Sequence, residues 1–349
     1  MKHDLLKSIL KKTTRNISKP TLKEMKITQG VIKKIYDWAN SMTIYGELAS
    51  YIPELSKADP SRSAITIGDL YNNIISVSNG INITPSVQSV IKPFLYIYAL
   101  EKGMIAENIS GLEATASPFN VDRILQPELH EKKASHPFNN AGSISAAGTI
   151  NNFEDFLNFI KVLTGNPKTA VLEDVFRSEM KTNSNNKAIT YRLVASGHFK
   201  TQEKGIKALE NYTRACALGM NTENAVQASL VLASGGIKRN RQIIKKDNIV
   251  RAINAMNSYG LYEHTGEISL LAAGARALSC KSGVGGLIIN IDPGRGAFCT
   301  YGALLDSAGN SVFGKYALVP LNNILAAPGA MRLSAEEITR SLSIDRKNN

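Results

Sequence analysis

The sequence has few of the residues that cross-link small secreted proteins or bind metals. It contains three cysteines in 349 residues, Cys216, Cys280 and Cys299, and no two of them form a Cys-x-x-Cys pair. An odd number of isolated thiols favours reduced cysteines in the cytoplasm over a disulfide framework. The five histidines form no His-x-x-x-His or Glu-x-x-His pair, so we expect no metal site and no cofactor.

The sequence also lacks any uncharged apolar run of about 18 residues, so we expect no membrane span. The start of the chain, MKHDLLKSILKK, is basic but has no apolar core behind it, which is untypical of a secretory signal. Hydrophobic residues make up 43% of the chain and charged residues 20%, as in globular proteins. We therefore expect a cytoplasmic protein with one large domain or two interleaved ones.

Positive charge is concentrated near the N-terminus. The net charge is +12, and residues 1–40 hold ten Lys or Arg against three acidic residues. Such an arm could bind nucleic acid or an acidic lipid surface. Its aromatic residues are Tyr36 and Trp38, which give no platform for stacking bases. We therefore favour a solvated helix face and expect no nucleic-acid partner.

Strand-like runs lie near both ends of the main body, with helical runs between them. Alternating and β-branched residues predict strands at 63–67, 73–78, 287–291 and 297–304. Apolar residues at helical spacing predict helices at 30–45, 89–103, 153–163, 202–219, 223–233 and 334–340. Turn residues cluster at 181–186 and 234–236. This order predicts an antiparallel sheet built from both ends of the chain.

We assign the chain to the α+β class, with helices flanking an antiparallel sheet and a second, mostly helical lobe. The sheet lobe is expected at about 29–92 and 240–325, and the helical lobe at about 93–239. A basic arm, 1–28, precedes this folded body of 29–325, and a tail, 326–349, follows it. The cleft between two such lobes is where a ligand is expected to bind.

A serine and a lysine stand at the start of one predicted helix. Ser89 and Lys92 are three residues apart, so their side chains share a helix face. A desolvated lysine has a lowered pKa and can accept the serine proton, and the helix N-terminus adds free backbone N–H groups. Pro93 is tolerated in the first turn. Because the pattern is common by chance, alone it favours a surface pair.

A second short motif, Lys281-Ser282-Gly283, precedes the predicted strand at 287–291. In penicillin-binding proteins and β-lactamases, a Lys-Ser/Thr-Gly triplet on an edge strand forms one wall of the active site. The glycine permits close approach of the backbone, and neighbouring N–H groups can hold an oxyanion. Alone the triplet favours a turn, but the two motifs in this order indicate a serine hydrolase.

Further segments follow the order of motifs in one enzyme family. They are Tyr51-Ile-Pro-Glu-Leu55, Gln88-Ser-Val-Ile-Lys-Pro93, Asn140-Ala-Gly142, Val175-Phe-Arg-Ser-Glu179 with Asn186, Asn211-Tyr212, Gly260-Leu-Tyr262-Glu-His-Thr-Gly266, Lys281-Ser-Gly-Val284 and Gly309-Asn-Ser-Val312. From about residue 46 to 315 the chain thus resembles the serine-dependent glutaminases, members of the penicillin-binding-protein and β-lactamase-like superfamily. The resemblance implies hydrolysis of L-glutamine to L-glutamate and ammonia, and a β-lactamase-like or D,D-peptidase-like fold.

The chain departs from the family pattern at four places. His136-Pro-Phe-Asn139 stands where the family usually has Asn-Pro before its Asn-Ala-Gly, and Ser279-Cys280 replaces Pro-Ala before Lys-Ser-Gly. Asn185 replaces an arginine, and Leu287 takes the place of a third glycine. None of these changes removes a residue to which the resemblance assigns chemistry, so they bear on loop geometry and substrate affinity.

The resemblance implies a role for each residue at the reacting end of the substrate. Ser89 would attack the amide carbon, forming a γ-glutamyl-enzyme that water hydrolyses, with Lys92 as the base. Tyr262 would be a proton shuttle whose pKa is depressed by two ammonium groups. Lys281 would add positive field, and the N–H groups of Ser89 and Val284 would hold the oxyanion.

The amino-acid end of glutamine carries two charges, and the resemblance implies residues for both. Glu179 would bind the α-ammonium. Asn140, Asn186, Tyr51 and Tyr212 would donate hydrogen bonds to the α-carboxylate. Each of these residues alone would more often be an ordinary core, turn or surface residue, so only the joint pattern favours binding. By resemblance we also expect a homodimer or homotetramer.

Two other functions remain open. A D,D-peptidase or β-lactamase would share the two short motifs, but no Ser-Asp-Asn stands between them. A non-catalytic relative, acting as a binding protein through its basic arm, is the other alternative. The intact Ser89, Lys92, Tyr262 and Lys281 argue against it, and ammonia release from glutamine would separate the possibilities.

Overall fold

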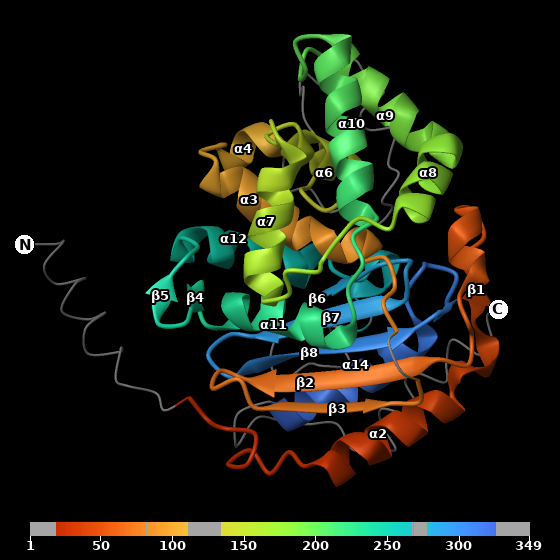
Figure 1. Ribbon diagram of the computed structural model, residues 1–349, viewed down its shortest axis with the longest axis vertical. Coiled ribbons are helices and arrows are strands. Elements are labelled where there is room, and N and C mark those ends of the chain that lie inside the picture. Colours follow the sequence, from red (N-terminus) through yellow and green to blue (C-terminus); the bar gives the residue numbers. More distant parts are fainter. Residues whose placement is uncertain (1–18, 81–82, 111–133, 267, 269–277, 326–349) are drawn as a thin grey trace, which may run out of the picture.

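The computed structural model describes residues 19–80, 83–110, 134–266, 268 and 278–325, and in this part of the chain five strands form one central sheet. Their order is β3-β2-β8-β7-β6, and neighbouring strands are antiparallel (Figure 1). The strands are β2 Ser63–Asp69, β3 Ile74–Ser78, β6 Ser279–Ser282, β7 Leu287–Asp292 and β8 Gly296–Gly302. Strand β2 pairs with β8, so segments far apart in the chain share the sheet, as the sequence predicts.

Side chains alternate across the sheet and divide the core into two parts. Ile65 and Ile67 of β2 face one side together with Phe298 of β8, whereas Ala64 and Ala297 face the other. Helices α2 (Gln29–Ser41) and α14 (Val312–Leu325) cover the first side. Helix α11 (Thr222–Ala233) packs on β2, β7 and β8 from the second side (Figure 1). The sheet is therefore buried between two helical layers.

A lobe of helices stands above the α11 side of the sheet in Figure 1. Its members are α3 Lys92–Glu101, α4 Ala106–Ile109, α6 Asn140–Ala147, α7 Phe153–Thr164, α8 Glu173–Thr182, α9 Ser184–Ala195, α10 Gln202–Cys216 and α12 Lys246–Tyr259. Helix α3 packs on α6 and α12, and α10 packs on α6, α8 and α9. Every α3 residue from Lys92 to Leu100 is buried, so α3 is a central helix of this lobe.

Short elements complete the described part of the chain. Strand β1 (Glu47–Leu48) pairs with β9 (Leu304–Leu305), and β4 (Ile237–Lys238) pairs with β5 (Arg241–Gln242). The 3-10 helices are η1 Thr43–Tyr45, η2 Pro53–Lys57, η3 Gln88–Ile91 and η4 Tyr262–His264. Two of these, η3 and η4, carry residues of the candidate site.

The predicted α+β class and the predicted antiparallel sheet are confirmed, but α12 and α14, two helices outside the predicted helical lobe, are missing from the prediction. Helix α14 has Gly314 near its start and Pro320 inside it, and both residues disfavour a helix interior. Helix α12 is rich in asparagine, which has a weak helix propensity. Both helices nevertheless bury apolar side chains, α14 against β7 and β8 and α12 against α3 and β6. Tertiary packing thus outweighs local propensity here.

The predicted turn at 181–186 is also shorter than expected. Helix α8 runs to Thr182 and α9 begins at Ser184, so Asn186 lies in the first turn of a helix. The turn at 234–236 is confirmed. The helix predicted at 334–340 lies outside the described residues, as does the expected tail at 326–349.

Two residues assigned to the basic arm belong to the core. Leu22 and Ile27 are buried in the cluster formed with α2 and α14. The N–H of Leu22 donates to the carboxylate of Asp69 at 2.7 Å. The chain therefore joins the folded body before α2 begins.

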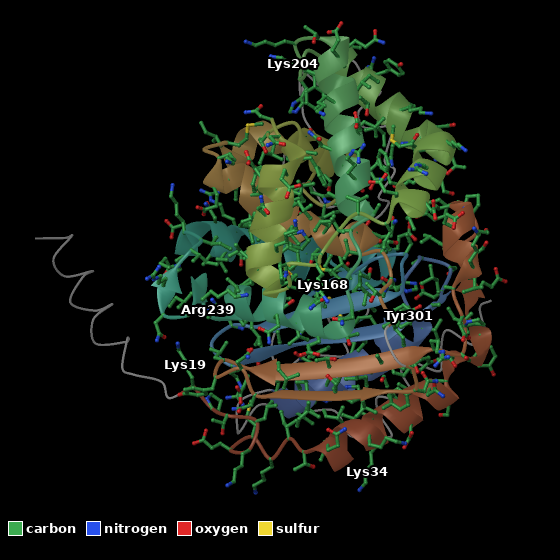
Figure 2. The ribbon with its side chains drawn as sticks, viewed as in Figure 1. Lys19, Lys34, Lys168, Lys204, Arg239 and Tyr301 are labelled. Atoms are coloured by element: carbon green, nitrogen blue, oxygen red, sulfur yellow. The ribbon has the colours of Figure 1, made fainter. Side chains whose placement is uncertain are left out.

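Basic side chains of the described body lie on separate elements. Lys34 is on α2, Lys204 is in α10 and Arg239 is in the turn between β4 and β5 (Figure 2). These cations do not form one stripe along a single element. Within the described residues, no helix is both long and apolar enough to cross a membrane.

Candidate active site

Ser89 and Lys92 lie at the start of the central helix of the upper lobe. Ser89 belongs to η3, and Lys92 is the first residue of α3. The N–H of Lys92 donates to the carbonyl of Ser89, and residues three apart eclipse each other in such a 3-10 turn. The two side chains therefore share one face, as their spacing predicts. The preceding Gln88 has a φ of 46°, a left-handed conformation that stores on the order of 1–3 kcal/mol of strain in a non-glycine residue.

Strand β6 forms a wall beside the serine. It is an edge strand of the described sheet, as the resemblance implies for the Lys-Ser-Gly triplet, although the sequence patterns predict no strand at 279–282. A Cβ atom at Gly283 would lie 2.6 Å from the carbonyl oxygen of Val87 and 3.1 Å from the backbone nitrogen of Ser89. Glycine is therefore required for β6 to approach η3 this closely. The next residue, Val284, lines the same cavity as Ser89.

Tyr262 contacts Ser89 and opens η4 with a φ of 54°. The Ser89 hydroxyl interacts with its phenol, which donates to the carbonyl of Ser282 at 3.3 Å. Burial raises the pKa of Tyr262 to about 12, although Ser89 and Ser282 act in the opposite direction. The depressed pKa expected from the sequence is therefore wrong. Nζ of Lys281 lies over the phenol ring, 4.2 Å from its centroid, and does not offset the desolvation of the phenolate oxygen.

The two lysines are buried, and burial destabilises their charged forms. It lowers the pKa of Lys92 to about 8. It lowers the pKa of Lys281 well below the ordinary value, and the nearby Lys92 adds to this shift. Nζ of Lys92 donates to the carbonyl oxygen of Phe138 at 2.9 Å and to Oδ1 of Asn140 at 2.7 Å. Lys92 is partly neutral near neutral pH and can accept a proton.

One asparagine links Lys92 to other polar groups of the site. Oδ1 of Asn140 accepts hydrogen bonds from Lys92 and, at 3.1 Å, from the hydroxyl of Tyr212. Nδ2 of Asn140 donates to Oδ1 of Asn186 at 2.8 Å. Because an ammonium group can only donate, this network fixes the orientation of the Asn140 carboxamide. It leaves the NH₂ group of Asn186 as a donor for a ligand.

Glu179 is the buried carboxylate of the site, with 6% of its surface exposed. Nε2 of Gln88 donates to its Oε2 at 3.3 Å. Burial raises the pKa of Glu179 to about 7, while Gln88 and Lys92 act in the opposite direction. A bound ammonium would favour the ionised carboxylate, so Glu179 is suited to a cationic ligand group. Among the described residues, no cluster of three or more His, Cys, Asp or Glu side chains could hold a metal ion.

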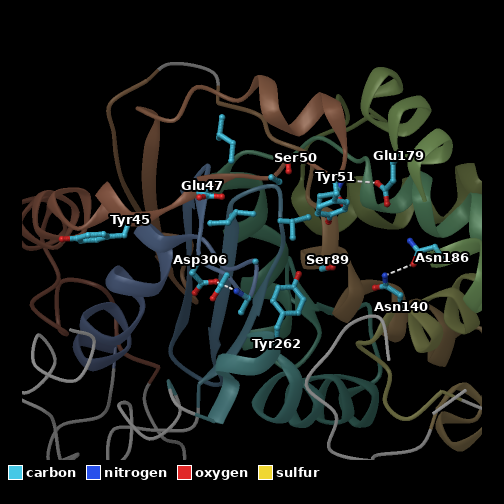
Figure 3. Close-up of a pocket in the computed structure, with 18 of the residues that line it drawn as sticks. Tyr45, Glu47, Ser50, Tyr51, Ser89, Asn140, Glu179, Asn186, Tyr262 and Asp306 are labelled. Carbon is cyan, nitrogen blue, oxygen red and sulfur yellow. Dashed lines mark hydrogen bonds between the residues drawn. The ribbon is translucent and has the colours of Figure 1, made fainter. Parts of the chain in front are cut away.

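These side chains surround one cavity of about 560 Å³, the size of a small-molecule site. Figure 3 shows Glu179, Asn140 and Asn186 to one side of Ser89, and Tyr262 and Asp306 to the other. All the residues with an expected substrate contact line the cavity: Tyr51, Ser89, Asn140, Glu179, Asn186, Tyr212, Tyr262 and Val284. Lys92 and Lys281 lie behind this lining and contact it through Asn140 and Tyr262. The structure therefore brings all ten candidate residues together.

A group of hydrogen-bonded polar side chains behind η4 was not predicted from the sequence as part of the site. The carboxylate of Asp306 lies 3.1 Å from Nδ1 of His264 and 3.0 Å from Nζ of Lys315. Although burial would raise it, the pKa of Asp306 is lowered to about 2 by these partners and by backbone donation from Asn310. The side chain of Asn310 also donates to the carbonyl that precedes the site tyrosine, at 3.3 Å. The motif at 309–312, which includes Asn310, was the part of the sequence that could have indicated this group.

The comparisons with known proteins agree with this geometry. The family model described as Glutaminase matches residues 46–327. A glutaminase from Clostridioides difficile (strain 630) is 30% identical over 310 residues, which cover 86% of this chain and 97% of the relative. A glutaminase from Colwellia psychrerythraea (strain 34H / ATCC BAA-681) is 31% identical over 277 residues, which cover 76% of this chain and 86% of the relative.

Solved structures are similar in fold. A probable glutaminase, ybaS, has a TM-score of 0.75 and 27% identity, over 85% of this chain and 97% of that chain. A probable glutaminase from Bacillus subtilis, complexed with 6-diazo-5-oxo-L-norleucine, has a TM-score of 0.68 and 24% identity, over 83% of this chain and 94% of that chain. The similarity extends over both lobes and confirms the expected β-lactamase-like fold. The chain therefore belongs to the serine-dependent glutaminase family and is an enzyme that hydrolyses glutamine.

Proposed function

We propose that Ser89 attacks the side-chain amide carbon of L-glutamine and forms a γ-glutamyl ester, which water then hydrolyses to L-glutamate. The observation that carries this proposal is the position of Ser89. It lies in the wall of the cavity, on one helical face with a partly neutral lysine, and in contact with a phenol. A serine hydroxyl becomes a useful nucleophile when a base takes its proton.

Lys92 is the proposed base. Its pKa of about 8 leaves a fraction of neutral amine at neutral pH. During acylation the proton of Ser89 would pass to this amine while the serine oxygen bonds to the amide carbon. The backbone N–H groups of Ser89 and Val284, which make no hydrogen bond to another described residue, would hold the carbonyl oxygen as it becomes an oxyanion.

Tyr262 acts in this proposal as a neutral phenol. With a pKa raised to about 12 it is protonated at neutral pH, so it can donate a proton to the leaving nitrogen as the carbon–nitrogen bond breaks. Nζ of Lys281 faces its ring and, when it holds a proton, stabilises the phenolate formed at that moment. Ammonia then leaves, and the proton gained by the base returns to the phenol. Deacylation repeats these transfers in reverse, with water in place of ammonia.

The amino-acid end of glutamine would lie between Glu179 and Asn186. The α-ammonium would meet the carboxylate of Glu179, which is buried and accepts a hydrogen bond from Gln88. The α-carboxylate would accept from the NH₂ group of Asn186. In this arrangement Asn140 and Tyr212 act mainly by holding Asn186 and Lys92, because their own hydrogen bonds are made within the protein.

Ammonia release from L-glutamine by the purified full chain tests this proposal. We expect turnover that saturates with glutamine and is lost in Ser89→Ala. A folded protein that binds glutamine without releasing ammonia would favour the non-catalytic alternative. Turnover of a penicillin-type amide in its place would favour the D,D-peptidase or β-lactamase alternative. The homodimer or homotetramer and the cytoplasmic location stay predictions, and sedimentation of the purified chain measures the former.

A further inference from the structure

His136 closes the loop that leads into helix α6. It is 3% exposed, and its Nδ1 atom accepts hydrogen bonds from the backbone N–H groups of Phe138 at 3.2 Å and Asn139 at 3.1 Å. A ring nitrogen that accepts hydrogen bonds carries no hydrogen, so this ring is neutral with its proton on Nε2. The side chain therefore does what an aspartate or asparagine oxygen does in an Asx-turn.

Other contacts hold the same loop in place. The His136 ring stacks on Tyr259 of α12, with centroids 4.2 Å apart and planes 10° apart. The side chain of Asn139 accepts from the N–H of Gly142 at 2.7 Å and donates to the hydroxyl of Ser135 at 2.8 Å. A Cβ atom at Gly142 would lie 2.3 Å from the carbonyl oxygen of His136. The loop thus packs directly on the first turn of α6.

This loop supplies the hydrogen-bond acceptors that Lys92 has among the described residues. They are the carbonyl oxygen of Phe138, at 2.9 Å, and Oδ1 of Asn140, at 2.7 Å. The carbonyl of Phe138 and the N–H of Asn139 belong to one planar peptide unit and point in opposite directions. When His136 accepts from the N–H of Asn139, it therefore fixes the plane whose carbonyl faces Lys92.

We propose that His136 is a positioning residue for Lys92: through the peptide between Phe138 and Asn139 it holds the lysine in its reactive place. The inference rests on the proposed role of Lys92 as the base. Without an acceptor at position 136 the peptide is free to rotate, and its carbonyl no longer orients the ammonium group. A displacement near 1 Å in a reacting group costs about a hundredfold in rate, so loss of the acceptor lowers kcat.

The test compares His136→Asn, which keeps an acceptor, with His136→Ala, which removes it. The matched control is His198→Asn, in the loop between α9 and α10. Measured are kcat and KM for glutamine at about pH 8, with thermal melting of each variant. We expect kcat to fall about tenfold to a hundredfold in His136→Ala and to stay within about threefold of wild type in His136→Asn, whose carboxamide oxygen can accept from the same backbone N–H groups.

Several outcomes would overturn the inference. One is a folded His136→Ala variant with wild-type kcat. Another is an equal loss of kcat in folded His136→Ala and folded His136→Asn, which would make ring stacking on Tyr259 the decisive contact. Lys92→Ala, measured beside them, separates this inference from the proposed function. If Lys92→Ala keeps its activity, the proposed role of Lys92 as the base is wrong. If Lys92→Ala is inactive while His136→Ala is active, only the positioning role of His136 is wrong.

Discussion

Nζ of Lys92 lies 2.7 Å from Oδ1 of Asn140. Nδ2 of the same carboxamide donates to Asn186 at 2.8 Å, so one side chain joins the proposed base to the proposed site of the substrate α-carboxylate. The neutral amide leaves the pKa of Lys92 where burial sets it, at about 8. A charged group at position 140 would change both the protonation of the base and the binding of the substrate.

Asn140→Asp should therefore shift the pH dependence of catalysis. In the wild type, kcat rises with pH as Lys92 loses its proton, with a midpoint near 8. A carboxylate beside the ammonium stabilises the charged form, so the midpoint should move up by at least about one pH unit, with about a tenfold loss at neutral pH. The measurement is kcat against pH, with Asn185→Asp on the exposed side of α9 as the control. An unchanged midpoint in a folded Asn140→Asp protein would exclude Lys92 as the titrating base.

Glu179→Gln should weaken glutamine binding. Removing the carboxylate leaves the substrate ammonium without a counter-charge in a buried site, which typically costs about 3–5 kcal/mol and hence a hundredfold or more in kcat/KM. The wild-type KM should also fall as pH rises through about 7, where Glu179 ionises. Glu173→Gln, on the same helix, is the control. Equal KM values for the two variants would show that the ammonium binds elsewhere.

Glu179→Gln should also stabilise the ligand-free protein at alkaline pH. The pKa of Glu179 is raised from 4.5 to about 7, so the folded state holds a proton that the unfolded state loses between these values. The free energy of unfolding therefore falls as pH rises through this window, by on the order of 3 kcal/mol. Melting curves should show Glu179→Gln more stable than wild type at about pH 8, with a smaller difference at about pH 4. The reverse order would mean that the carboxylate is not desolvated.

Much of the site could be predicted because its chemistry lies in short motifs. The spacing of Ser89 and Lys92 fixes a common helix face, and the glycine of the Lys-Ser-Gly triplet fits a strand that approaches η3 closely. The pKa of Tyr262 could not be predicted in the same way. Burial of the phenol raises this pKa, and only the folded backbone decides how deeply the side chain is buried.

The elements missed by the sequence patterns depend on long-range packing. Helix α14 tolerates Pro320 because its apolar side chains are buried against the sheet. Leu22 looks like part of a charged arm, yet it is buried in the cluster formed with α2 and α14, and Asp69, far away in the sequence, accepts its N–H. His136 stood out only as a departure from a family motif, and its turn-closing role required the positions of two backbone N–H groups.

L-asparagine should be a poor substrate. Glu179 and Asn186 would hold the charged end of the substrate, and Ser89 lies at the reacting end of the same cavity. Asparagine is one methylene shorter and cannot reach both, so we expect a loss of at least about a hundredfold in kcat/KM. The measurement compares glutamine, asparagine and glutamine amidated at its α-carboxylate. Comparable rates for asparagine, or no penalty for the α-amide, would rule out the two-ended arrangement.

Removal of residues 1–18 should leave catalysis intact, whereas removal of residues 1–27 should destabilise the protein. The longer deletion takes away Leu22 and Ile27, which are buried beside α2, and each buried apolar side chain contributes about 1.5–3 kcal/mol. Thermal melting and glutamine turnover of the two truncations at low and moderate salt give the comparison. Loss of activity in a well-folded protein lacking only residues 1–18 would show that the arm takes part in the active assembly.

The central claim is that Ser89 carries the γ-glutamyl group, and acid quenching of the enzyme during turnover tests it most directly. Mass spectrometry of the digested wild type should show a mass increase of one glutamyl group on the peptide that contains Ser89. Ser89→Ala should show no adduct, a wild-type melting temperature and a loss of turnover on the order of 10⁴-fold or more. An adduct on a different residue, or substantial ammonia release by folded Ser89→Ala, would contradict the account.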